Sequence, residues 1–137
     1  MDKAKRGDVI YVDRGLYYHF GVYENPQSII HYAPVGKDKA KLGIGSNPVI
    51  HITTLKDFLD GAQSYVICEF SVLWYKLFSQ EETIKRARSK VGEREYSLAL
   101  NNCEHFATWC KTGKNESYQG LRLFGVQEKK VSLHAQE

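Results

Sequence analysis

The chain lacks any long apolar run. No stretch approaches the roughly 18 residues that a membrane-spanning helix needs. No apolar segment follows the charged N-terminal stretch MDKAKRGDVI, so a secretory leader is not expected either. We therefore expect a soluble, cytoplasmic protein.

Cysteine is scarce, with residues only at positions 68, 103 and 110. They form neither a CxxC pair nor a CxxC…HxxxH spacing, which argues against a structural zinc site. In a reducing compartment a disulfide framework is not expected. The sequence thus predicts no metal and no cofactor, and it leaves each cysteine as either a core side chain or a nucleophile.

A strong excess of one charge is also missing. The net charge is +3, which is too small for a nucleic-acid-binding surface, so we predict no nucleic-acid partner. Hydrophobic residues make up 42% and charged residues 26%, as in a chain that packs a core. The 137 residues suit one domain, with a core at about 7–113 and a short C-terminal tail at 114–137.

Strand patterns dominate the first half of the chain and helix patterns the second. This order predicts an α+β fold, an antiparallel β-sheet with helices packed on one side. The glycine-rich segment 35–47 reads as a long loop, residues 96–100 read as a short extended piece, and no element is predicted in the tail. The expected strands cover 9–12, 17–23, 28–33, 49–53 and 64–72, and the expected helices cover 55–59, 79–91 and 103–112.

The segment NNCEHF places Cys103 at the start of its helix, because Asn101 and Asn102 are favourable capping residues. Unpaired backbone N–H groups at a helix start favour negative charge and lower the pKa of a thiol. The same N–H groups can hold an oxyanion that develops on an acyl substrate. The position therefore suits an activated nucleophile.

The competing interpretation is that Cys103 packs in the core. Cys103, Phe106, Ala107 and Cys110 share one helical face, as core residues do. Cys110 lies two turns into the helix and Cys68 lies in an apolar strand, so both are predicted to be core. For Cys103 the residues alone leave both roles open.

A nucleophilic cysteine needs a base. His105 is two positions away and points to another side of the helix, so it is not the candidate. His19 and His31 lie in neighbouring predicted strands and can meet on one face of the sheet. His19 would then take the thiol proton and His31 would orient His19, while Gly21 would leave room for an incoming group. His51 is a weaker third candidate and His134 is expected to be exposed.

Two segments together resemble a known family. GDVIYVDRGLYYHFGVYENPQSIIHYAP, followed downstream by NNCEHFATWCKTG, is similar to the lecithin:retinol acyltransferase-like (LRAT-like) domain. That group includes the HRAS-like suppressor phospholipases/acyltransferases, belongs to the permuted NlpC-like superfamily, and is similar to H-box/NC proteins of some picornaviruses. The resemblance spans about 7–113 and implies a circularly permuted papain-like fold.

By this resemblance Cys103 matches the nucleophile, His19 the general base and His31 the histidine that orients it. It implies that Cys103 attacks an acyl ester, often a lipid, and forms a thioester that water or an acceptor then receives. Membrane-bound animal members carry a hydrophobic C-terminal segment that this sequence does not show. Transient contact with a membrane surface would then give access to an acyl lipid. An NlpC-like cysteine peptidase or amidase and a non-catalytic binding scaffold stay open as alternatives.

Overall fold

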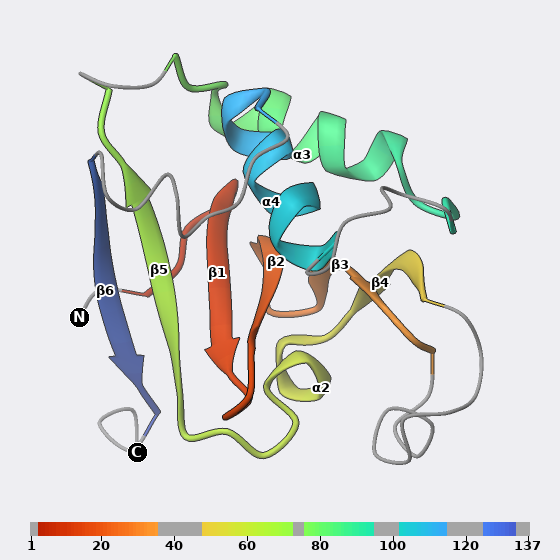
Figure 1. Cartoon of the computed structure of the whole chain (residues 1–137), viewed down its shortest axis with the longest axis vertical. Coiled ribbons are helices and arrows are strands. Elements are labelled where there is room, and N and C mark those ends of the chain that lie inside the picture. The colour runs from red at the N-terminus through yellow and green to blue at the C-terminus, as the bar shows by residue number, and fades with distance from the viewer. Residues whose placement is uncertain (1–2, 36–47, 73–75, 95–101, 115–124, 134–137) are drawn as a thin grey trace.

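The computed structural model describes residues 3–35, 48–72, 76–94, 102–114 and 125–133. An antiparallel sheet in the strand order β4-β3-β2-β1-β5-β6 forms its centre, and the fold is α+β, as predicted (Figure 1). The elements in chain order are β1 (Asp8–Asp13), β2 (Tyr18–Asn25), β3 (Ser28–Ala33), β4 (Val49–Thr53), α2 (Leu55–Leu59), β5 (Ser64–Phe70), α3 (Gln80–Ser89), α4 (Asn102–Thr112) and β6 (Val126–Ser132).

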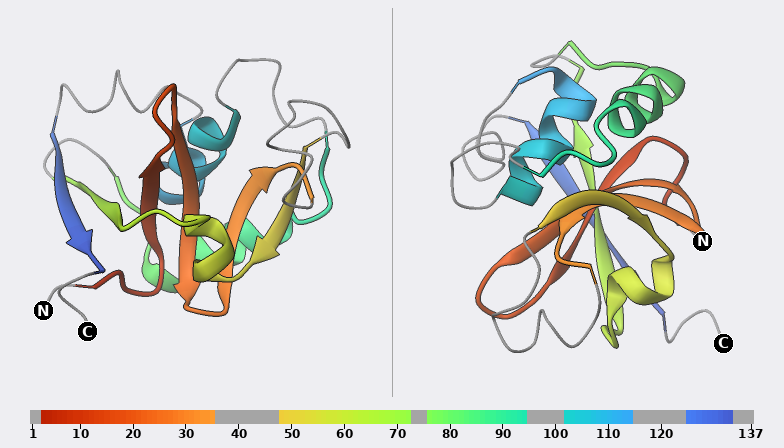
Figure 2. Two further views of the ribbon diagram at one scale, coloured as in Figure 1. Left: turned by 90° about the horizontal axis from the view of Figure 1, so that it is seen from below. Right: turned by 90° about the vertical axis from the view of Figure 1, so that its right-hand side faces the viewer.

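Side chains on the strands alternate between two core layers. Val9 and Tyr11 of β1 pack with α3 and α4, whereas Ile10 and Val12 pack with α2. The helices therefore lie on both faces of the sheet rather than on one side as expected (Figure 2). The short helix α2 takes the second face because Phe58 and Leu59 are buried there.

Capping side chains begin two helices where the sequence predicted them. Thr54 Oγ1 accepts a hydrogen bond from the Asp57 N–H at 3.1 Å, and Ser79 Oγ accepts one from the Glu82 N–H at 3.1 Å. Helix α3 ends at Ser89, two residues before the predicted end, because the Lys90 N–H already bonds back to Ala87. None of the described helices has the length and apolarity required to span a bilayer.

Strand β6 was not predicted. It pairs antiparallel with β5 and most of its side chains are exposed, so it has little hydrophobic alternation for a sequence pattern to reveal. Backbone pairing with β5 places it in the sheet. The predictions for residues 36–47 and 96–100 lie outside the described residues.

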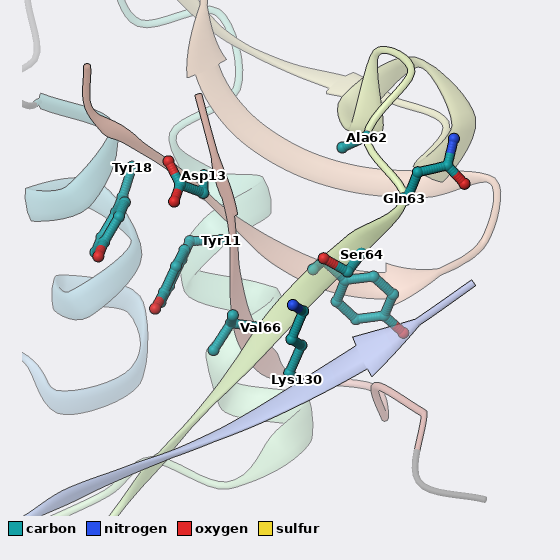
Figure 3. A pocket seen from close by; sticks show the side chains of 9 residues that line it. Tyr11, Asp13, Tyr18, Ala62, Gln63, Ser64, Val66 and Lys130 are labelled. Carbon is teal, nitrogen blue, oxygen red and sulfur yellow. The ribbon is translucent and has the colours of Figure 1, made fainter. Parts of the chain in front are cut away.

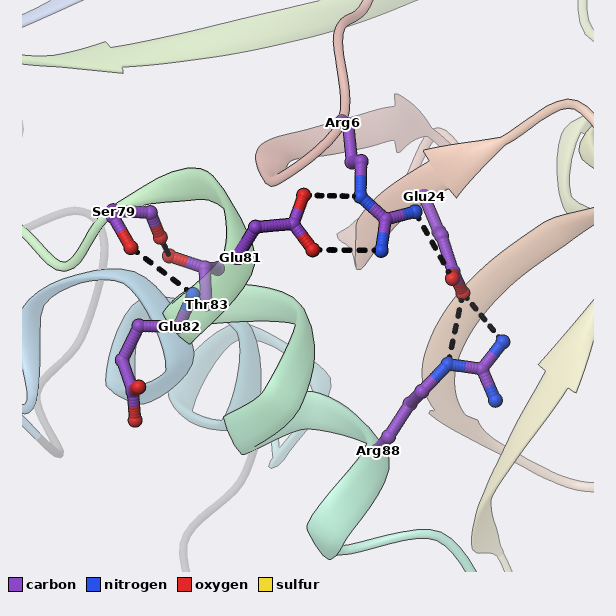
Figure 4. Close-up of polar contacts among 7 residues, drawn as sticks. All are labelled: Arg6, Glu24, Ser79, Glu81, Glu82, Thr83 and Arg88. Atoms are coloured by element: carbon purple, nitrogen blue, oxygen red, sulfur yellow. Dashed lines mark hydrogen bonds and ion pairs between the residues drawn. The ribbon is translucent and has the colours of Figure 1, made fainter.

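Four charged side chains connect the N-terminal segment, β2 and α3 (Figure 4). Arg6 donates to Glu81 and Glu24, and Arg88 donates to Glu24 from the other side. The distance from Arg6 Nη1 to Glu24 Oε2 is 3.1 Å, and that from Arg88 Nη2 to Glu24 Oε1 is 2.6 Å. We call these four residues the charged cluster; it lies at the C-terminal end of β2.

Candidate active site

The two predicted histidines meet on one face of the sheet. His31 pairs directly with Gly21 in the β2–β3 ladder, and His19 lies two residues from Gly21 on the same face. The distance between His19 Nε2 and His31 Nδ1 is 2.9 Å, which is a hydrogen bond. The prediction that these side chains lie close together is therefore confirmed.

Phe58 of α2 covers this histidine pair. Its ring centroid lies 5.2 Å from that of His19 and 5.7 Å from that of His31. A Cβ atom added at Gly21 would lie 2.8 Å from Phe58 and 2.9 Å from Ile29. The expectation that Gly21 leaves room for an incoming group is therefore wrong, because the missing side chain makes room for Phe58.

Burial keeps both histidines uncharged. It lowers the pKa of His19 to about 3, with smaller contributions from the charges of Arg14 and His51. Burial also lowers the pKa of His31 well below its usual value. In a neutral pair one ring donates and the other accepts. If His19 Nε2 donates to His31, Nδ1 of His19 carries the lone pair that a general base requires.

Cys103 lies in the first turn of α4 against the backbone of β2. The residue is 7% exposed and its Sγ lies 3.8 Å from the carbonyl oxygen of Tyr18, the residue that precedes His19. The pairing of β2 with β3 begins at Gly21 and His31, so Tyr18 and His19 lie in the part of β2 that precedes this pairing. Helix α4 contacts both strands, and its N-terminal end lies beside them (Figure 1). The fold thus brings the cysteine of the second half of the chain to the histidine strand of the first half.

Two opposing effects act on the Cys103 thiol. Burial raises its pKa, while the backbone N–H groups of Phe20, Glu104 and Cys103 itself favour the thiolate and lower it. The net direction is upward, so the expected lowering by the helix start is outweighed. The resting thiol is protonated at neutral pH, and its S–H donates to the Tyr18 carbonyl.

The other cysteines and histidines also have defined places. Cys68 and Cys110 are 4% and 0% exposed, which confirms both as core residues, and all three cysteines of the chain are free. His105 is half-buried in α4, and His134 lies outside the described residues. Sequence reasoning underrated His51, whose ring centroid lies 4.5 Å from that of His31. Among the described residues no three His, Cys, Asp or Glu side chains are grouped to hold a metal ion.

A cavity of about 440 Å³ opens on the face of the sheet that carries α4 (Figure 3). The stacked rings of Tyr11 and Tyr18, with centroids 4.4 Å apart, form one wall. Asp13 and Lys130 also line it and add charges of both signs. Tyr18 connects the cavity with the thiol, because it lines the cavity and its carbonyl oxygen contacts Cys103 Sγ.

The chain is similar in sequence to a known protein family and to several characterised proteins. The lecithin retinol acyltransferase family model matches residues 2–116. The chain is 31% identical to lecithin retinol acyltransferase of Mus musculus over 136 residues, which covers 87% of this chain and 59% of the relative. It is 32% identical to the Homo sapiens enzyme, covering 79% of this chain and 54% of the relative. It is also 32% identical to phospholipase A and acyltransferase 1 of Rattus norvegicus, covering 88% and 75%.

The chain thus spans only a little more than half the length of the lecithin retinol acyltransferases that it matches, and about three quarters of the phospholipase A and acyltransferase. The family match nevertheless includes both segments that carry the site, the histidine strands and the start of α4. This chain belongs to the lecithin retinol acyltransferase family.

Proposed function

We propose that the protein is a thiol-dependent acyltransferase or phospholipase-type hydrolase that takes an acyl group from an ester, with a lipid as the natural donor. Cys103 is the nucleophile, His19 the general base, and His31 the residue that orients His19. The observation that carries this proposal is the 2.9 Å bond between His19 Nε2 and His31 Nδ1, and the contact of the Cys103 thiol with the carbonyl of Tyr18, the residue before His19, supports it. The names of the relatives support the reaction class.

In the first step Nδ1 of His19 takes the Cys103 proton while Sγ attacks the ester carbonyl carbon. The carbonyl oxygen becomes an oxyanion, and the backbone N–H groups that favour the Cys103 thiolate are the proposed donors to it. The carbon–oxygen ester bond then breaks, and the departing alkoxide takes the proton from His19 Nδ1. The products are an alcohol and a Cys103 thioester.

In the second step an acceptor O–H or N–H gives its proton to His19 Nδ1 and attacks the thioester carbonyl. The carbon–sulfur bond breaks, and Sγ recovers the proton from His19. Water as acceptor gives a hydrolase, whereas an alcohol or amine gives a transferase. Since burial disfavours charge on both Cys103 and His19, proton transfer and carbon–sulfur bond formation are expected to be concerted.

His31 supports this cycle by its position rather than by touching the substrate. An acceptor at His31 Nδ1 holds the His19 proton on Nε2 and leaves Nδ1 as the base. It also stabilises the imidazolium that forms when His19 has taken the thiol proton, as the third member of a catalytic triad does.

One observation favours a second candidate, a non-catalytic binding scaffold. Cys103 is 7% exposed, and burial raises the pKa of its thiol, as for a core cysteine. A cysteine amidase would use the same three residues and differ only in the bond that it cleaves. The experiment therefore has to separate ester, amide and no reaction.

The test is intact-mass analysis after incubation with a short-chain activated ester and, in parallel, with the matching amide. We expect wild type to gain one acyl group from the ester and Cys103→Ser to gain none. The matched control is Cys110→Ala, which removes a buried thiol from the same helix and should still acylate.

Acylation by the amide at a comparable rate would favour the amidase. No adduct from either reagent, across several chain lengths and with a free Cys103 confirmed by thiol titration, would favour the binding scaffold.

A further inference from the structure

A third histidine extends the pair on the side away from His19. His51 of β4 is the direct cross-strand partner of His31. The strand order β4-β3-β2 places His31 between His51 and His19. The ring centroids are 4.5 Å apart for His31 and His51, and 5.1 Å apart for His19 and His31. The three imidazoles thus form a continuous row across three strands.

Two nitrogens in this row are buried and unpaired. Nε2 of His31 and Nε2 of His51 have no hydrogen-bond partner within the described part of the chain. A buried polar atom without a partner destabilises the folded protein, because its hydrogen bonds to water are lost without replacement. Two such atoms on neighbouring rings are unusual in a folded protein and often mark a functional site.

The backbone around His51 is held from both sides. Its neighbour Ile50 donates to the Glu93 carbonyl at 3.0 Å and accepts from the Gly92 N–H at 2.8 Å, while β4 pairs with β3 on its other edge. Phe58 packs against the His31 ring on the same face of the sheet. The His51 ring therefore has a fixed place against His31.

We propose that His51 is a positioning residue, which sets the tautomer of His31 and through it the basic nitrogen of His19. This inference rests on the proposed function, because it assigns a role in the same site. For His19 Nδ1 to act as base, His31 Nδ1 must accept from His19, and a neutral His31 then carries its proton on Nε2. That nitrogen is buried and has no hydrogen-bond partner among the described residues, and the His51 ring packs against the His31 ring with the centroids 4.5 Å apart.

The His51 ring favours this arrangement in two ways. An imidazole face or nitrogen close to the His31 N–H stabilises the Nε2 proton, in the way that outer partners fix the tautomer of a ligating histidine. A charged His31 would face His19 on β2, His51 on β4 and the Arg14 guanidinium, with only the uncharged Phe58 from α2. No carboxylate is among these neighbours to stabilise a positive charge. The three imidazoles therefore stay neutral, and each keeps its proton on one nitrogen.

The test combines nitrogen–proton correlation spectra of the histidine rings with acylation rates across pH, for wild type, His51→Phe and His51→Gln. In wild type we expect the proton of both His19 and His31 on Nε2. His51→Phe keeps a ring but removes both nitrogens, so we expect His31 to lose its single tautomer and acylation to slow by roughly 10- to 100-fold. His51→Gln keeps a polar group and should recover most of the rate.

The matched control is Thr53→Val, on the same strand and face as His51 and paired with Ile29. It should leave the spectra and the rate unchanged. If His51→Phe does not fold, His51→Leu is read in the same way. Unchanged tautomers in the apolar variant overturn the proposal, whatever happens to the rate. The spectra need no substrate, so this outcome is distinct from a failure of wild type to form a thioester.

Discussion

Strand β2 carries Glu24 near one end and His19 near the other, and the two ends treat polar side chains in opposite ways. Glu24 accepts from two arginines in the charged cluster, and each arginine is partly open to solvent (Figure 4). His19 is buried, uncharged and bonded to another buried histidine whose second nitrogen is unpaired. The charge at the Glu24 end is fully paired, whereas the His19 end contains a buried nitrogen that has no hydrogen-bond partner among the described residues.

The difference suggests that the Glu24 end of β2 contributes to stability, whereas the His19 end suits the proposed reaction. Charges that are paired near water help to attach the N-terminal segment and α3 to the sheet. Buried neutral imidazoles contribute less to stability than apolar side chains would, which fits the proposed role of His19 as a base. The pKa shifts at the two ends have different causes. Hydrogen bonding between Arg6 and Glu81 raises the pKa of Arg6 and lowers that of Glu81, so both charges are favoured, whereas burial lowers the pKa of His19 and of His31 and disfavours their charged forms.

The largest difference between the two ends of β2 is expected when His19 is replaced. In His19→Asn we expect thioester formation to slow by about 10²- to 10⁴-fold, because the general base is lost while a hydrogen-bond donor to His31 remains. Stopped-flow or quenched mass measurement of the acylation rate checks this. A rate within a factor of about three of wild type would mean that His19 is not the base.

Acidification should act on the histidine end and spare the charged end. The pKa of His19 and that of His31 are lowered in the folded protein, so the unfolded chain binds protons first as pH falls below about 6.5. The contribution of His19 to stability is therefore full above pH 6.5 and declines toward pH 3 by about 1.4 kcal/mol per pH unit, and that of His31 declines in the same direction. Urea unfolding at several pH values measures this slope.

His19→Asn should remove about half of that pH dependence, while Glu24→Gln should leave its slope between pH 6.5 and 5 as in wild type. A wild-type stability that does not change over this range would contradict the assignment of two buried neutral histidines.

Filling the space at Gly21 tests the packing that surrounds the pair. In Gly21→Ala the new methyl group meets Phe58 and Ile29 at less than 3 Å, so we expect a loss of roughly 1–3 kcal/mol and a displaced Phe58 ring. Thermal unfolding gives the first quantity and the His19 ring chemical shifts the second. Gly15→Ala is the contrasting variant, since Gly15 has a positive φ of 91° and no neighbour within 4 Å of an added Cβ, so it tests backbone strain without a packing clash, whereas Gly21 does not have a positive φ.

The smallest effect is expected at the charged cluster. Glu24→Gln keeps the shape of the side chain but removes the charge between Arg6 and Arg88, and we expect a loss of about 1 kcal/mol in low salt. The difference from wild type should shrink in 1 M NaCl because salt screens exposed charges. The acylation rate should not change, and a large drop in rate would show that the two ends of β2 are coupled.

Local patterns in the sequence predicted much of this architecture. Strand alternation located β1 to β5, and the Thr54 and Ser79 caps located the starts of two helices. The same alternation predicted His19 and His31 on one face of the sheet, since a side chain in a strand repeats its direction every second residue. The permuted relation to papain-like folds stays a prediction from resemblance.

Long-range packing accounts for what the sequence did not reveal. β6 exists through backbone pairing with β5, which leaves no pattern of apolar side chains in its own residues. The role of Gly21 and the burial of Cys103 depend on Phe58 and on β2, both distant in the chain. The direction of the Cys103 pKa follows from a balance between backbone N–H groups and desolvation. The N–H groups of Cys103 and Glu104 are local, whereas the N–H of Phe20 and the desolvation require the folded protein. A helix start is encoded in a few neighbouring residues, whereas the loss of water around a thiol depends on everything that packs upon it.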